Sequence, residues 1–169
     1  MGWLLEPSDP AVRHLALRQL LDRPADDPDV IGSLRAAMAA DPIAALLAAQ
    51  HPEGYWEKPG PGYATKYRGT VWQLIFLDQV GADPADPRVQ RACAYVLSHA
   101  QAESGGFGAS GAANLVAPPP SAVIHCLNGN LLRARPVGAV RRGDADDSFF
   151  RLWKCRSGSR RSRFDAVPV

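Results

Sequence analysis

The amino-acid sequence predicts an all-α protein of stacked helical hairpins, followed by an irregular basic C-terminal tail. Apolar residues recur at helical spacing in five successive stretches, and alternation with period two is nearly absent. Loops rich in Gly and Pro, at 51–68 and 102–120, separate the later helices and share a repeated pattern. We therefore expect an N-terminal helical segment at 1–40, two helical repeats at 41–134 and an Arg-rich tail at 135–169.

The dipeptide Asp-Pro marks most of the predicted helix starts. An Asp side chain accepts hydrogen bonds from the free N–H groups of a first helical turn, and Pro fits the next position because it has no N–H to leave unpaired. The aspartates of these pairs are Asp9, Asp27, Asp41, Asp83 and Asp86. The apolar stripes that predict the helices span 12–20, 30–38, 43–50, 71–80 and 89–100.

A seven-residue pattern occurs twice, 51 residues apart. Each copy ends a helix with Ala-Gln, crosses a glycine turn and reaches an aromatic ring. A fixed spacing of matched residues indicates stacked units, because no single unit buries its apolar face alone. The matched positions are Gln50, Gly54 and Trp56 in the first copy and Gln101, Gly105 and Phe107 in the second.

The pattern Gln-x-x-x-Gly-x-Trp/Phe resembles the QW motif of squalene–hopene and oxidosqualene cyclases, which recurs loosely in protein prenyltransferase β subunits. The resemblance covers about residues 40–135, and the second copy departs from it by ending in Phe107. It implies an α/α toroid, present here as an incomplete arc, in which each Gln caps a helix end and packs on the ring. It also implies an apolar isoprenoid ligand and, if the chain is active, cation-driven cyclisation or prenyl transfer.

Three tail carboxylates form the candidate catalytic set. Asp144-Ala-Asp146-Asp147 matches the Asp-x-Asp-Asp motif of the same cyclases, and crowded carboxylates share protons so that one stays protonated and can donate. The resemblance implies that Asp146 is the donor and that Asp144 and Asp147 modulate it. The sequence favours the alternative, a solvated acidic run, because the surrounding tail is polar.

Ligand contacts are predicted in the most aromatic stretch of the chain and in the segment after the second loop. Aromatic faces stabilise carbocations, although a loop pinned by aromatic packing is the favoured alternative. In the later segment we expect a buried structural Cys126 rather than a zinc site, because adjacent helical residues point about 100° apart. Asn128 either contacts a ligand or faces a neighbouring loop. The predicted ligand-binding residues are Trp56, Tyr63, Tyr67, Trp72, His125 and Asn128, with no metal and no cofactor.

Charge and composition exclude several classes of function. Residues 1–132 carry nine basic and thirteen acidic side chains, whereas 133–169 carry ten and four, so the main body is acidic and no nucleic-acid partner is predicted. No run approaches the roughly 18 apolar residues of a membrane span, and no signal peptide is recognised. Three cysteines without CxxC spacing indicate reduced thiols and a cytoplasmic protein.

Two other interpretations remain open from the sequence. Residues 9–22 look like the second helix of a HEAT repeat, which favours a non-catalytic scaffold that binds a protein or apolar ligand. Apolar periodicity stops after 132 and Arg becomes frequent, which favours a truncated gene or a changed reading frame, with a disordered tail and no independent function.

Overall fold

The computed structural model describes residues 2–102, 104–109 and 118–133, and this part of the chain is helical. No β-strand is formed within these residues; the extended contacts there are isolated bridges in the loop after α5. The predicted helical fold is therefore confirmed for the described residues. The tail at 135–169, with Asp144, Asp146 and Asp147, lies outside them. No described helix is both long enough and apolar enough to cross a membrane.

The first five α-helices coincide with the five predicted apolar stripes. The shorter helical turns are η1 (Gly2–Leu5), the π-helical η2 (Ala16–Leu20) that continues α1, and η3 (Pro120–Ala122). The α-helices are α1 (Pro10–Leu15), α2 (Pro28–Ala39), α3 (Ile43–Ala48), α4 (Thr70–Gln79), α5 (Pro87–His99) and α6 (His125–Arg133).

Three of the five Asp-Pro pairs cap helices as predicted. Asp9, Asp27 and Asp86 each accept a backbone N–H two or three residues further on, at 3.1, 2.8 and 2.8 Å, and each is followed by Pro in the first turn. Asp83 accepts an N–H at 2.8 Å in the turn between α4 and α5. Asp41 does not cap α3, which begins without a side-chain cap hydrogen bond.

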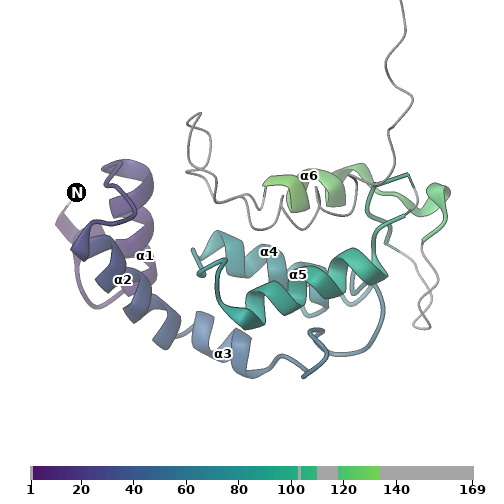
Figure 1. Ribbon diagram of the computed structural model, residues 1–169, viewed down its shortest axis with the longest axis horizontal. Helices are drawn as coiled ribbons and strands as arrows, with labels where there is room; N and C mark the ends of the chain where they lie inside the picture. Colours follow the sequence, from purple (N-terminus) through teal and green to yellow (C-terminus); the bar gives the residue numbers. More distant parts are fainter. Residues whose placement is uncertain (1, 103, 110–117, 134–169) are drawn as a thin grey trace, which may run out of the picture.

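Helix α4 occupies the centre of the later helices. It packs against α3, α5 and α6, while α1 and α2 pair at the other end of the molecule and α2 leads into α3 (Figure 1). Because α4 has neighbours on several sides, it is apolar nearly all round, as expected for an enclosed helix. Its buried apolar residues are Val71, Leu74, Ile75 and Leu77. They share one core with α5 and α6, through Val96, Leu127 and Leu131 among others.

The cap of α5 provides a test of this helix-start chemistry. Asp86 accepts the Arg88 N–H and pairs with the Arg88 guanidinium at 2.8 Å, which lowers the pKa of the Asp86 carboxyl. We expect Asp86→Ala to reduce the free energy of unfolding by about 1 kcal/mol, because a first-turn N–H loses its acceptor. Thermal denaturation followed by circular dichroism measures the change.

The control for this prediction is Asp26→Ala. Asp26 is exposed, and its side chain has no hydrogen bond or ion pair to the described residues. This variant should leave the melting temperature of the chain unchanged. Equal destabilisation by the two substitutions would contradict the capping role of Asp86.

Candidate ligand-binding site

The loops that follow α3 and α5 form the same turn, which we call the repeat turn (residues 50–56, and 101–102 with 104–107). Gln50 Nε2 donates to Gly54 O at 3.4 Å, and Gln101 Nε2 donates to Gly105 O at 3.4 Å. The N–H of the residue after each Gln donates to the carbonyl four residues further on, His51 to Tyr55 and Ala102 to Gly106, each at 2.8 Å. In the opposite direction, the Gly54 N–H donates to His51 O at 2.8 Å and the Gly105 N–H donates to Ala102 O at 2.9 Å. The glycines have φ of 101° and 86°. The sequence repeat is thus a repeat of backbone structure.

The first repeat turn is hydrogen-bonded to a residue outside the turn, through the side chain of Gln50. Gln50 Nε2 also donates to Arg88 O at 3.0 Å, which joins the loop after α3 to the first turn of α5. Gln101 has no second hydrogen bond of this kind to the described residues. The interpretation of the Gln as a link between hairpins therefore matches the geometry at Gln50, whereas Gln101 bonds only within its own turn.

Trp56 connects the first repeat turn to the helices on either side of it. The side chain is 4% exposed, and the indole Nε1–H donates to Leu46 O in the last turn of α3 at 2.8 Å. The Trp56 backbone N–H donates to Thr70 Oγ1, at the start of α4, at 3.2 Å. The Trp56 ring is consequently held between α3 and α4, where it forms one wall of a pocket.

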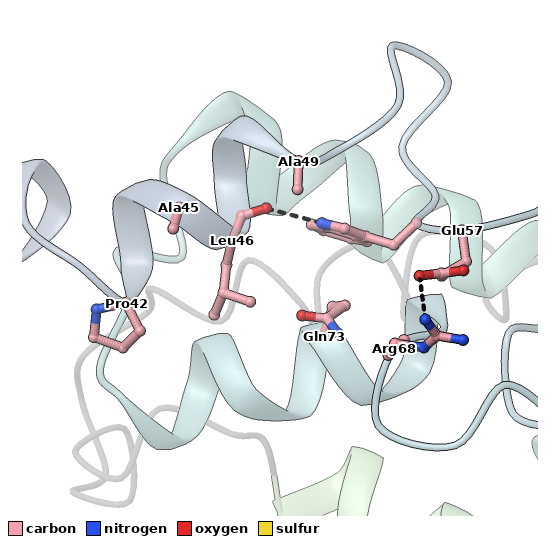
Figure 2. Close-up of a pocket in the computed structure, with 8 residues that line it drawn as sticks. Pro42, Ala45, Leu46, Ala49, Glu57, Arg68 and Gln73 are labelled. Atoms are coloured by element: carbon pink, nitrogen blue, oxygen red, sulfur yellow. Dashed lines mark hydrogen bonds and ion pairs between the residues drawn. The ribbon is translucent and has the colours of Figure 1, made fainter.

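A pocket of about 360 Å³ lies between α3 and α4 (Figure 2). Most of its wall is apolar and comes from α3 and the residues that flank it. The loop after α3 and the start of α4 add the ring of Trp56 and three polar side chains. The lining residues are Pro42, Ala45, Leu46, Ala49, Trp56, Glu57, Arg68 and Gln73.

Gln73 contributes a buried side-chain amide to the wall of this pocket. Its side chain is 7% exposed, and Nε2 donates to Tyr67 O at 2.7 Å. Because a carbonyl can only accept, this bond fixes which end of the amide faces Tyr67. Oε1 is buried and has no hydrogen-bond partner among the described residues, and it is directed toward the Leu46 side chain in Figure 2. A buried acceptor left unpaired costs about 1–3 kcal/mol.

An ion pair lies beside the amide of Gln73. Arg68 Nη1 is 3.6 Å from Glu57 Oε1, and the two side chains are 71% and 39% exposed, so the pair contributes little to stability. Glu57 and Tyr67 have φ of 64° and 65°, in the left-handed region that non-glycine residues seldom adopt. The backbone on both sides of the pocket is therefore held by its surroundings in strained conformations, which commonly occur at ligand sites.

The other aromatic residues of the predicted ligand set lie apart from the pocket lining. Tyr63 and Tyr67 pack on Trp72 with ring centroids 5.4 and 5.3 Å apart, and Trp72 Nε1 donates to Tyr63 O at 2.9 Å. Lys66 Nζ lies 5.2 Å from the centre of the Tyr67 ring. Such contacts are typical of a loop pinned by aromatic packing, which is the alternative interpretation given above. Of the predicted ligand-binding residues, Trp56 alone lines the pocket.

His125 and Cys126 lie exposed on α6. The prediction that Cys126 is buried is therefore wrong; its thiol lies 3.9 Å from the Tyr63 hydroxyl, and this contact raises the pKa of Tyr63. Burial raises the pKa of the Cys93 thiol to about 12, so it carries no thiolate at neutral pH. Among the described residues no three His, Cys, Asp or Glu side chains are grouped as metal ligands.

Asn128 holds the second repeat turn. Its Oδ1 accepts the Phe107 N–H at 2.9 Å, and its Nδ2 donates to Phe107 O at 3.1 Å and to Ile124 O at 2.7 Å. Both ends of the amide are thus bonded to backbone. Asn128 therefore contacts a neighbouring loop, which is one of the two roles predicted for it.

No protein-family model matches the chain, and no curated protein or solved structure matches it. The function of the pocket has to be inferred from its geometry. Sequence reasoning missed Glu57, Arg68 and Gln73 as members of a site. The signal was present for Gln73, a polar amide inside the otherwise apolar run Val71 to Leu77.

The two repeat-turn glycines give a matched prediction. A Cβ on Gly54 would lie 2.8 Å from Arg91 O, whereas a Cβ on Gly105 would meet no atom of the described residues within 4 Å. Both positions have positive φ, so each Ala variant carries a strain of about 1 kcal/mol. We expect Gly54→Ala to destabilise the chain clearly more than Gly105→Ala, because only the former also displaces α5.

Urea denaturation of the two variants measures this difference. The control is Gly32→Ala, in α2, where the added methyl group meets nothing within 4 Å and φ is helical. Equal losses at Gly54 and Gly105 would show that α5 does not rest on the first repeat turn.

Proposed function

We propose that this chain is a helical-repeat binding module that takes an apolar ligand between α3 and α4 and does not transform it. The pocket carries this proposal, because it is open and its wall is mostly apolar. The buried polar side chains of the described residues are Ser33, Thr70 and Gln73, so no carboxylate is buried there to act as a strong acid. This corresponds to the scaffold interpretation of the sequence.

We propose further that the repeats belong to an α/α arrangement like that of the terpenoid cyclases and protein prenyltransferases. Two observations support this. The repeat turn recurs with the same hydrogen bonds after α3 and after α5, and each turn is followed by a helix that packs on α4 or is α4 itself. In such an arrangement α3 and α5 are outer helices, and α4 and α6 are inner ones.

The binding function is tested by filling the pocket from Ala49, the residue that follows α3. Ala49 lines the pocket, whereas the neighbouring Ala48 does not, and both are exposed. We expect geraniol, as an apolar probe, to bind the wild-type chain and the Ala48→Phe variant equally, and to bind Ala49→Phe at least tenfold more weakly. Isothermal titration calorimetry measures the three affinities; absence of binding to the wild type, or equal binding to all three, would contradict the proposal.

A second candidate function is isoprenoid cyclisation or prenyl transfer by the same repeats. The observation that favours it is the row of aromatic rings Tyr63, Trp72, Tyr67 and Phe76, because aromatic faces stabilise cations. Its candidate acids, Asp144, Asp146 and Asp147, lie outside the described residues. Mass spectrometry after incubation with squalene or geranylgeranyl diphosphate tests this function, and the absence of product from either would count against it.

A further inference from the structure

The helix pair α1–α2 meets the rest of the molecule at the turn between α4 and α5, which lies on the side facing that pair (Figure 1). We call this contact, between α1–α2 and residues 80–83, the joint. We propose that the joint is pH-sensitive: protonation of His14, whose half-buried ring lies in it, weakens the attachment of the α1–α2 pair. This inference goes beyond the proposed binding function and does not depend on it.

The end of α1 lies directly against the turn. A Cβ on Gly81 would be 2.9 Å from Leu15 Cδ2 and 3.5 Å from His14 Cδ2. Gly81 also has φ of 74°, a conformation that residues with a side chain seldom adopt. The glycine therefore lets the backbone of the turn approach α1 closely, and the His14 ring is part of the contact.

Helix α2 contributes to the same joint through Met38. Its Sδ accepts the Asp83 N–H at 3.2 Å, and a thioether is a weak acceptor. The Met38 side chain packs against the apolar core together with Val80 and Ala82 of the turn. Apolar packing of this kind tolerates a neutral imidazole, whereas a charged group in the same place has to be desolvated.

The hydrogen bonds of His14 are those of a neutral ring. Ser33 Oγ donates its single proton to Val30 O at 2.9 Å, because a carbonyl can only accept. At its 3.3 Å contact with His14 Nδ1, the Ser33 hydroxyl is consequently the acceptor and Nδ1 is the donor. A second proton would have to bind at Nε2. His14 takes part in none of the ion pairs between described residues, so no carboxylate at salt-bridge distance would compensate the charge.

The groups around His14 favour its neutral form. Burial has the largest effect and lowers the pKa of His14. The hydrogen bond with the Val30 carbonyl raises it, Arg18 on η2 lowers it and Asp83 in the turn raises it. From α2 the ring is faced by the Val30 carbonyl and the Ser33 hydroxyl, neither of which carries a charge. The result is a pKa below the ordinary value of a histidine.

The direction of the pH effect follows from this lowered pKa. When the joint opens, the ring returns to water and binds a proton more readily, so protonation favours the open form. The contribution of His14 to the joint is fully present above the ordinary histidine pKa of about 6.5, and it is lost as the pH falls through the lower pKa of the closed form. Carboxylates stay ionised above about pH 5, so they do not produce a loss in this range.

Hydrogen exchange on the full wild-type chain tests where the loss occurs, at about pH 7.5 and about pH 5.5, on either side of the ordinary histidine pKa. After correction for the intrinsic exchange rates, the amides of α1 and α2 should lose protection at the lower pH, while those of α4 and α5 keep theirs. Unchanged protection of α1 and α2, or an equal loss in all four helices, would overturn the proposal.

A pair of substitutions tests whether His14 is responsible. His14→Gln keeps a side-chain N–H donor and does not titrate; His125→Gln, at an exposed position of α6, is the control. Between the same two pH values the melting temperature should fall less in His14→Gln than in the wild type, and His125→Gln should fall as the wild type does. Equal falls in all three chains would overturn the proposal. If His14→Gln fails to fold, the exchange experiment on the wild type decides alone.

Discussion

The structure depends on the position of Trp56, because this one residue fixes the end of α3 against the start of α4. Its indole satisfies a carbonyl at the end of α3, and its backbone N–H bonds the first residue of α4. The last backbone carbonyls of a helix, such as that of Leu46, have no intrahelical partner. Since α3 is a helix of only six residues, its last turn would otherwise be weakly held. The pocket exists because the same ring that fastens the two helices also spans the space between them.

The difference between the two repeat turns has a geometric cause. Gln50 reaches Arg88 O because α5 passes beside the first turn, close enough that Gly54 cannot carry a Cβ. Beside Gly105 no described atom lies within 4 Å of the corresponding position, and Gln101 bonds only within its turn. The same local sequence therefore builds the same turn in both places, while the connection to the next helix depends on whether a neighbour is present.

Much of the fold could be predicted because its signals are local. Capping by Asp9, Asp27 and Asp86 follows from the chemistry of a first helical turn, and the glycine turns follow from a repeated pattern. The exposure of Cys126 depends on which neighbour lies opposite, which a periodic pattern does not contain. The local pattern does not separate Asp41, which does not cap α3, from the three aspartates that cap their helices. The rings of the aromatic stretch pack on one another, and their contact with a ligand stays a prediction.

The pocket could not have been found from motifs because its polar members play no part in the repeat. Their residue types change between the two copies, whereas the Gln, the Gly and the ring are kept or replaced by a similar residue. Residues that build the repeat are constrained in every copy, but a ligand site needs to be formed only once. In a repeat protein, the positions that break the pattern while remaining buried are therefore the first places to look for function, and Gln73 is such a position in this chain.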